Sequence, residues 1–400
     1  MKVCIVSSRF YPQIVGSGMS AFVIARGLHQ LGHQVTVLTD ESIKMELSTA
    51  TGVDFSVKYI RSLETFAVGK TGLKAPLDDL YLHIRKVNPD IIHVCNFMPM
   101  SLITIIRDKL ACPVVFSFFN TPVIGKRTVG CFSDPDVENS FGAFVIKANA
   151  YDSLILGSEY YVKAALCLGA NRNKILLSYL APDITSLDIT KSVDASKFFD
   201  AGFEDLPYIL LPSRITPQKG ITDAVKMLSI INNQLDTTYY LVLTGMANPF
   251  NHEYATEVRE LGEKLSVNEY VLAPRAPVDR TSLAILFKNA SLVLIPSWYE
   301  GLGLSAIEAQ YLRAPLAVSD TVGLSEVVED GRTGVMFRPK DAYSMSEAVL
   351  RVLRGGVDIE EMLDQAQESA RKFSIDKHIT EIESQYKRLI EKVSIDEEEA

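Results

Sequence analysis

The sequence from residue 292 to residue 309 reads Leu292-Val293-Leu294-Ile295-Pro296-Ser297-Trp298-Tyr299-Glu300-Gly301-Leu302-Gly303-Leu304-Ser305-Ala306-Ile307-Glu308-Ala309. It begins with an apolar run of strand length, continues through a loop with two glycines, and enters a helical pattern near Leu304. In open α/β sheets, ligands bind beyond the carboxyl ends of the strands. The stretch therefore predicts a parallel strand, a ligand-facing loop and a covering helix in direct succession.

The same alternation of strands and helices runs through the whole chain and occurs twice. We expect strands at 2–7, 34–39, 90–95, 113–119 and 152–157, and again at 208–213, 239–244, 291–296, 315–318 and 334–337. Helical patterns lie at 19–32, 76–87, 100–110, 220–234, 252–266, 280–289, 304–313, 342–354 and 376–394. Apolar strands that alternate with helices form parallel sheets covered on both faces.

This pattern predicts an α/β protein of two doubly wound Rossmann-like domains that face a central cleft. A chain of 400 residues also exceeds what one hydrophobic core usually organises. We place the domains at 1–190 and 191–375, because the residues before the strand at Tyr208 lack a clear period.

Composition excludes some classes of protein. The net charge of −9 argues against a nucleic-acid binder, which needs a basic surface. The five cysteines are scattered and show no metal-ligand spacing, as expected of buried thiols in a reducing compartment. The chain opens on a strand pattern rather than a signal peptide, and no apolar run approaches the roughly 18 residues of a spanning helix. We expect a cytoplasmic protein without a transmembrane segment, for which peripheral membrane contact stays open.

The loop after residue 295 has the chemistry of a sugar-nucleotide site. Gly301 and Gly303 let backbone N–H groups approach a ligand closely, and a helix start favours an anion such as a diphosphate. Glu300 and Glu308 offer carboxylates to sugar hydroxyls, so that one would hold a transferred hexose and the other a ribose. In the alternative interpretation, Glu300 is a solvated loop residue and Ser305 to Glu308 form a capping box, in which Glu308 only bonds the backbone.

A second loop carries two cations after another apolar strand. It reads Leu211-Pro212-Ser213-Arg214-Ile215-Thr216-Pro217-Gln218-Lys219-Gly220. Arg214 offers a planar fork to phosphate oxygens, and Lys219 offers a compact charge. The alternative is a solvated loop with two surface cations.

Together these residues resemble the retaining GT-B glycosyltransferases of glycosyltransferase family 4 (GT4), also called group 1. That family carries an Arg-x4-Lys-Gly element and a Glu-x7-Glu element, and both spacings occur here. The resemblance extends to Thr244-Gly245-Met246, 315–320 and 326–334, and more loosely to Gly16-Ser17-Gly18, 32–37 and 89–93.

The resemblance implies transfer of a hexose-type sugar from a nucleoside-diphosphate sugar, UDP-linked by default, to an acceptor that the sequence does not name. Arg214, Lys219 and Glu300 are the implied catalytic residues: the two cations grip the diphosphate, and Glu300 contacts the hexose. The implied donor-binding residues are Gly16, Gly18, Gly245, Gly301, Leu302, Gly303, Leu304 and Glu308, the last on the ribose.

Further features are implied by the same resemblance. His93 and Asn120 are candidate contacts to the sugar or the acceptor. The family is metal-independent, so neither a metal site nor a cofactor is expected, and two protein cations take the part that Mg²⁺ has elsewhere. The first domain would lie on the acceptor side, and the helix at 376–394 would pack back on it.

Several positions depart from the family pattern. Phe119 stands where many relatives have His, and His93-Val94-Cys95 replaces a His-x-His. Leu180-Ala181 replaces an Asn-Gly between the domains, Val322-Gly323 replaces a glycine pair, and Arg275 replaces a glycine. These changes leave the sugar and the acceptor open, and they leave a non-catalytic GT-B partner subunit as an alternative. They do not touch the residues expected to bind the diphosphate.

A nicotinamide-dependent oxidoreductase is the other alternative. Gly16-Ser17-Gly18-Met19-Ser20-Ala21, with Asp40 further on, imitates a dinucleotide fingerprint. In that fold the first glycine follows the strand almost directly. Here Ser8 to Val15 intervene, which is more typical of a glycine-rich flap that faces a cleft.

Overall fold

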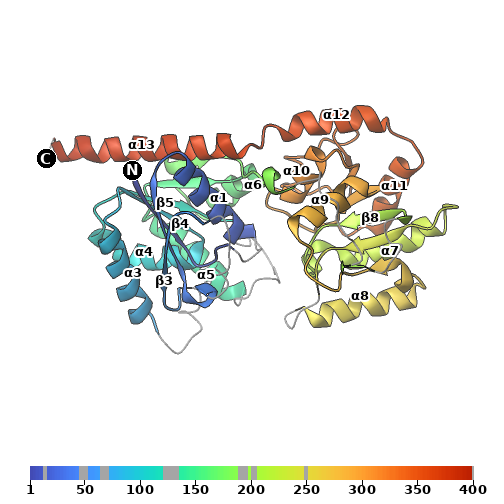
Figure 1. Ribbon diagram of the computed structural model, residues 1–400, viewed down its shortest axis with the longest axis horizontal. Coiled ribbons are helices and arrows are strands. Elements are labelled where there is room, and N and C mark those ends of the chain that lie inside the picture. Colours follow the sequence, from blue (N-terminus) through green and yellow to red (C-terminus); the bar gives the residue numbers. More distant parts are fainter. Residues whose placement is uncertain are drawn as a thin grey trace. The chain divides into compact units, whose positions relative to one another are not determined.

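The computed structural model describes residues 1–11, 16–44, 53–63, 72–119, 135–187, 197–199, 205–246 and 251–398. They form two compact units. Unit 1 contains the described residues up to Leu180 and those from Ser374 onward, and unit 2 contains Ala181–Phe373. The chain thus enters unit 2 before the predicted limit of residue 190. Each unit has its own sheet (Figure 1), and the α/β class with two doubly wound domains is confirmed.

Unit 1 is built on a seven-stranded parallel sheet with the order β3-β2-β1-β4-β5-β6-β7. The strands are β1 (Lys2–Ser7), β2 (Gln34–Asp40), β3 (Ser56–Ile60), β4 (Ile91–Cys95), β5 (Val114–Ser117), β6 (Ser153–Leu156) and β7 (Ile175–Leu177). The helices are α1 (Gly16–Gln30), α3 (Lys74–Val87), α4 (Phe97–Ile106), α5 (Pro135–Ala148), α6 (Glu159–Cys167) and α13 (Ile375–Glu398).

Unit 2 is built on a six-stranded parallel sheet with the order β10-β9-β8-β11-β12-β13. The strands are β8 (Tyr208–Leu211), β9 (Tyr240–Leu243), β10 (Val271–Leu272), β11 (Leu292–Ile295), β12 (Leu316–Ser319) and β13 (Val335–Phe337). The helices are α7 (Ile221–Asn232), α8 (His252–Lys264), α9 (Arg280–Asn289), α10 (Leu304–Tyr311), α11 (Ala342–Leu353) and α12 (Ile359–Ala370).

The strand order of unit 2 reverses between β8 and β11. These two strands pair in the sheet although β9 and β10 lie between them in the sequence. Leu292 is opposite Ile209, and Val293 is opposite Leu210. Such a reversal is the topological switch point of a doubly wound sheet, where ligands bind beyond the carboxyl ends of the strands. The two loops that the sequence singles out, after residues 211 and 295, both begin at this point.

The expected strands are all present, but β3, β7 and β10 lie outside the prediction. All three are edge strands, and their residues are mostly half-buried or exposed. An edge strand is covered less fully than a central one, so its sequence lacks the continuous apolar run on which the prediction relied. The helices α5, α6 and α12 were also not predicted.

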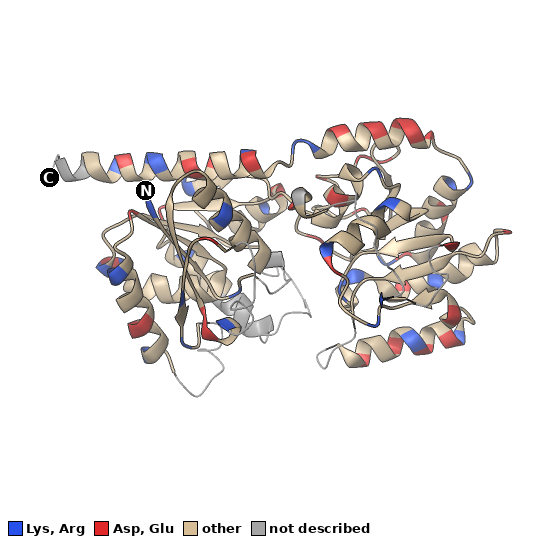
Figure 2. Ribbon diagram, in the orientation of Figure 1, with Lys and Arg blue, Asp and Glu red and all other residues tan. Residues whose placement is uncertain are grey.

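Helix α13 packs against α1 in unit 1 (Figure 1). Ile379, Ile382 and Tyr386 are almost completely buried on one side of α13, and residues of both charges lie along the helix (Figure 2). The approach to α1 is close at Gly27, where an added Cβ would lie 2.6 Å from Cγ1 of Ile379. Gly27 lies in the interior of α1, and its missing side chain allows the close contact, because no larger residue fits there against α13.

We predict that Gly27→Ala destabilises unit 1 by about 1–3 kcal/mol, because the new methyl group overpacks the contact with Ile379. In an Ile379→Ala background the same substitution should instead stabilise the protein by up to about 1 kcal/mol, since alanine favours a helix over glycine. Urea unfolding of the four proteins of this double-mutant cycle measures the change of sign. An effect of the same sign and size in both backgrounds would show that α13 does not meet α1 at Gly27.

Candidate active site

The loop after β8 leads through a short 3-10 turn, η7 (Pro217–Lys219), into α7. Gly220 joins the two with φ of +66°, and an added Cβ there would lie 2.1 Å from the backbone oxygen of Pro296. Only glycine therefore fits, since both the backbone angle and the space exclude a side chain. This close approach brings the loop after β8 against the loop after β11.

Side chains join the two loops as well. The backbone N–H and the indole Nε1–H of Trp298 donate to the backbone oxygen of Gln218 and to Oδ2 of Asp223, both at 2.8 Å. The hydroxyl of Tyr299 donates to Oε1 of Gln218 at 2.7 Å. These bonds fix the loop that carries Glu300 relative to the turn that carries Lys219.

Lys219 and Glu300 meet as a direct result. Nζ of Lys219 donates to Oε2 of Glu300 at 2.6 Å, and the hydroxyl of Ser297 donates to the same oxygen at 3.1 Å. The two side chains of the ion pair are 17% and 22% exposed, so both are shielded yet reachable from solvent. The sequence placed these residues 81 positions apart on separate motifs, and the structure brings them into one site.

Arg214 lies on the Lys219 loop and is exposed. Its guanidinium has no hydrogen bond or ion pair to the residues that the structure describes. Behind it, Gly245 follows β9, and an added Cβ there would lie 2.5 Å from the oxygen of Ser213 and 2.8 Å from Cα of Arg214. Gly245 thus supports the Arg214 backbone by close packing.

The Glu300 loop ends at Gly303, which has φ of +89° and is the N-cap of α10. Leu302, which was expected to contact the donor, is buried, so its side chain is not available to a ligand. The start of α10 at Leu304 lies in this loop, and a helix start carries positive partial charge. Gly323 packs behind the loop: an added Cβ would lie 2.2 Å from the oxygen of Glu300. Sequence reasoning treated Gly323 only as the remnant of a glycine pair and missed this contact.

Glu308 is buried in α10, and its environment shows that the capping-box alternative is wrong. The N-cap is Gly303, without a side-chain bond, and the hydroxyl of Ser305 donates weakly to the oxygen of Pro212 at 3.4 Å. Glu308 instead accepts from a guanidinium N–H of Arg280 at 2.8 Å. Burial raises the pKa of Glu308, an effect that the charge of Arg280 opposes. Sequence reasoning did not identify Arg280.

The predicted residues of unit 1 have different outcomes. Gly16 and Gly18 lie in the first turn of α1, which begins at Gly16 and not at residue 19, so they are helical rather than part of a flap. Asn120 lies outside the described residues.

His93 was expected as a candidate ligand contact, and the structure corrects this. It is fully buried in β4, with Nδ1 hydrogen-bonded to the hydroxyl of Tyr386 at 2.5 Å and Nε2 to the hydroxyl of Ser117 at 2.8 Å. Burial lowers its pKa to about 3. His93 therefore joins the sheet to α13 as a neutral side chain, and neither nitrogen is available to a sugar.

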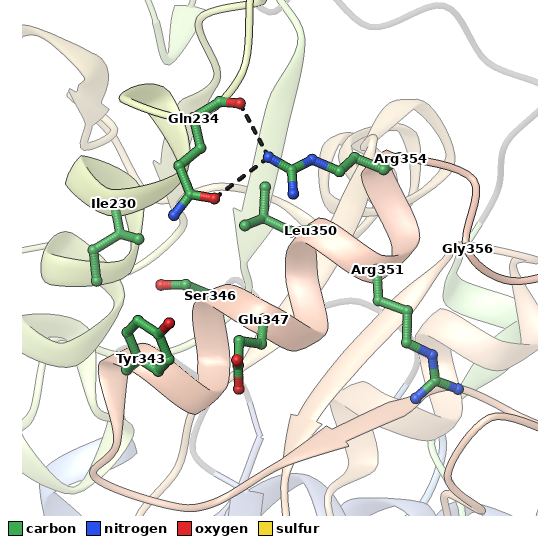
Figure 3. Close-up of a pocket in the computed structure, with 9 residues that line it drawn as sticks. All are labelled: Ile230, Gln234, Tyr343, Ser346, Glu347, Leu350, Arg351, Arg354 and Gly356. Carbon is green, nitrogen blue, oxygen red and sulfur yellow. Dashed lines mark hydrogen bonds between the residues drawn. The ribbon is translucent and has the colours of Figure 1, made fainter.

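A hollow of about 380 Å³ in unit 2 lies elsewhere, between α7 and α11 (Figure 3). Arg354 closes one side of it by donating to the backbone oxygen of Gln234 at 3.1 Å. None of the predicted site residues lines it. Within the described ranges, no three His, Cys, Asp or Glu residues gather as a metal ion would require. None of the described helices combines the length and the apolar character needed to cross a membrane.

Two family models match this chain. The model of glycosyl transferases group 1 matches residues 193–373, and the model of Glycosyltransferase Family 4 matches residues 14–172. An uncharacterized glycosyltransferase of Methanocaldococcus jannaschii is 24% identical over 358 residues, which cover 88% of this chain and 89% of that protein. A glycogen synthase of Mycobacterium tuberculosis is 24% identical over 380 residues, covering 88% and 86%.

Solved structures show the same fold. The Anabaena protein HepE in complex with UDP-glucose superposes with a TM-score of 0.77 at 16% identity, covering 97% of this chain and 100% of that one. Sucrose-phosphate synthase from Thermosynechococcus elongatus also gives a TM-score of 0.77 at 16% identity, covering 97% and 99%. The two family models together take in most of both units, and each independently describes a sugar transferase. The chain therefore belongs to the GT4-like, group 1 glycosyltransferases of GT-B fold.

Proposed function

We propose that this glycosyltransferase is a retaining, metal-independent enzyme that moves a hexose-type sugar from a nucleoside-diphosphate sugar, preferably UDP-linked, to an acceptor. The observation that carries the proposal is the Lys219–Glu300 pair at the switch point of unit 2. A cation for the diphosphate and a carboxylate for sugar hydroxyls stand there in contact, beside the exposed Arg214.

The charges in this site suit the departure of a nucleoside diphosphate. Arg214 and Lys219 bind the phosphate oxygens and stabilise the negative charge that develops on the leaving group, which is the part a metal ion has in other transferases. The amides at the start of α10 add positive partial charge. Glu300 accepts hydrogen bonds from the hexose, and Glu308 accepts from the ribose. The acceptor hydroxyl attacks from the face that the diphosphate leaves, through an oxocarbenium-like state, and its proton passes to an oxygen of the departing diphosphate. The configuration of the sugar is therefore retained.

The preference for UDP rests on fold neighbours. The Anabaena protein HepE has been solved with UDP, with UDP and glucose, and with UDP-glucose. It shares the fold of this chain at 16% identity, and this shared fold supports a UDP-sugar as the first donor to test.

We predict that Arg214→Ala and Lys219→Ala each lower turnover of the donor about a hundredfold, because each removes one group that stabilises charge in the transition state. The assay is release of nucleoside diphosphate from a panel of UDP- and GDP-sugars. Lys226→Ala is the matched control: this exposed lysine of α7 pairs with Asp223 at 3.6 Å and should leave turnover unchanged. EDTA should also leave wild-type turnover unchanged. Full activity in either variant, or loss of wild-type activity in EDTA, would contradict the proposed mechanism.

We predict that Glu308→Gln weakens binding of UDP about ten- to a hundredfold, because hydrogen bonds to a charged acceptor are worth roughly 1.5–3 kcal/mol. Calorimetry with UDP measures the effect. Ser305→Ala serves as the control, since Ser305 is not the N-cap of α10 and should change neither affinity nor stability by more than about 0.5 kcal/mol. Affinity of Glu308→Gln equal to that of the wild type would remove Glu308 from the donor site.

A further inference from the structure

Arg280 is held in unit 2 from three directions. It is the first residue of α9, whose N-cap Asp279 accepts a hydrogen bond from the backbone N–H of Ser282. Its guanidinium donates to Oε1 of Glu308 at 2.8 Å, to the hydroxyl of Ser186 at 3.1 Å and to the backbone oxygen of Asp183 at 3.2 Å. Nη2 makes both the ion pair with Glu308 and the bond to Asp183, while Nε makes the bond to Ser186. The contacts with residues 183–186 therefore hold the guanidinium in place, and its orientation toward the carboxylate does not depend on a ligand.

The ion pair occupies one oxygen of Glu308 and leaves the other available. Arg280 contacts Oε1, and no hydrogen bond to Oε2 occurs among the residues that the structure describes. The side chain of Glu308 is 8% exposed and that of Arg280 is 30% exposed. Because the ion pair holds Oε1 in place, the carboxylate has a fixed orientation, and Oε2 can accept hydrogen bonds from the hydroxyl groups of a ligand.

A buried carboxylate without a partner tends to take up a proton, because burial penalises its charged form. The charged groups that act on Glu308 are Arg280 of α9, which favours ionisation, and Asp183, which opposes it. On α12, which packs against α10, Glu360 and Asp364 are paired with Arg313 beyond the C-terminal end of α10. Arg280 is thus the cation on which the charge of Glu308 depends.

We propose that Arg280 is a positioning residue for the sugar nucleotide: it keeps Glu308 ionised and oriented so that the free carboxylate oxygen accepts the ribose hydroxyls. This inference rests on the proposed function, in which Glu308 binds the ribose. It adds a residue that lies outside both sequence motifs and that does not itself contact the donor.

The consequence is a specific dependence on pH. The ligand hydroxyls need an ionised acceptor, so the donor binds the carboxylate form of Glu308. The affinity for the donor therefore decreases as the pH falls through the pKa of Glu308 in the free enzyme. Burial already raises that pKa, and loss of Arg280 raises it further. Affinity should then fall at a higher pH in the variant than in the wild type, and it should recover at alkaline pH. A merely structural role for Arg280 would lower affinity equally at every pH.

The test is calorimetry with UDP-glucose between about pH 5.5 and pH 9, because the diester phosphates of this probe do not titrate in that range. With Arg280→Gln, we expect the fall in affinity to move upward by about one pH unit or more, as expected for loss of one opposite charge in contact. The variant should then bind about tenfold more weakly than the wild type at the acid end and within about threefold of it at the alkaline end. Arg280→Lys keeps the charge and should retain most of the wild-type profile.

Two further variants separate the possible failures. Glu308→Gln should be weak at every pH; if it binds like the wild type, the proposed role of Glu308 fails. If Glu308→Gln is weak while Arg280→Gln has the pH profile of the wild type, or is weakened equally at all pH values, the inference about Arg280 alone is overturned. Ser186→Ala keeps the ion pair and should keep the profile. Should Arg280→Gln not fold, the pKa of Glu308 measured by carboxyl carbon NMR in Arg280→Lys must lie within about one unit of the wild-type value, and a larger rise would contradict the inference.

Discussion

The contact between Lys219 and Glu300 is the interaction on which the candidate site of unit 2 depends. Two unlike charges lie 2.6 Å apart at the ends of loops that follow neighbouring strands of the sheet. Gly220, at the end of the loop after β8, lets the backbone approach Pro296 on the loop after β11, and the hydrogen bonds of Trp298 and Tyr299 fix this approach. Gly323, on the loop after β12, lies against the backbone of Glu300. A side chain at either glycine would displace the Glu300 loop, so both glycines help to set the position of the charges.

A second ion pair, between Arg280 and Glu308, differs from the first in its environment. Lys219 and Glu300 remain partly exposed, so a bound diphosphate can replace their mutual contact at modest cost in desolvation. Glu308 is buried, which raises its pKa, and its cationic partner, Arg280, opposes that rise. The site therefore combines a pair that can open toward a ligand with a carboxylate that the fold holds in place, which is the kind of preorganisation that binding sites require.

The sequence was sufficient to predict the fold class, because apolar strands buried in the middle of a parallel sheet leave an unmistakable pattern. The edge strands β3, β7 and β10 were missed because half-exposed strands lack that pattern. The family resemblance implied that Lys219 and Glu300 act on one donor, but their direct contact was not predicted; it follows from the pairing of β8 with β11, which brings the loops after these strands together. The pairing of Arg280 with Glu308 was not predicted either, because a single arginine at the start of a helix gives no sign of a partner in another helix. The prediction for His93 was wrong because a polar residue at the end of a strand looks like a ligand contact. Its hydrogen-bond partner in the structure is Tyr386 of α13, which lies almost three hundred residues later in the sequence.

The most direct test of the account is a crystal structure of the full chain with bound UDP. We expect the diphosphate oxygens within hydrogen-bonding distance of Lys219, Arg214 and the amides at the start of α10, with the ribose hydroxyls on the oxygen of Glu308 that Arg280 leaves open. A UDP molecule bound at the first turn of α1, or anywhere that leaves the Lys219–Glu300 loops without phosphate contact, would contradict the central claim that the switch point of unit 2 is the donor site.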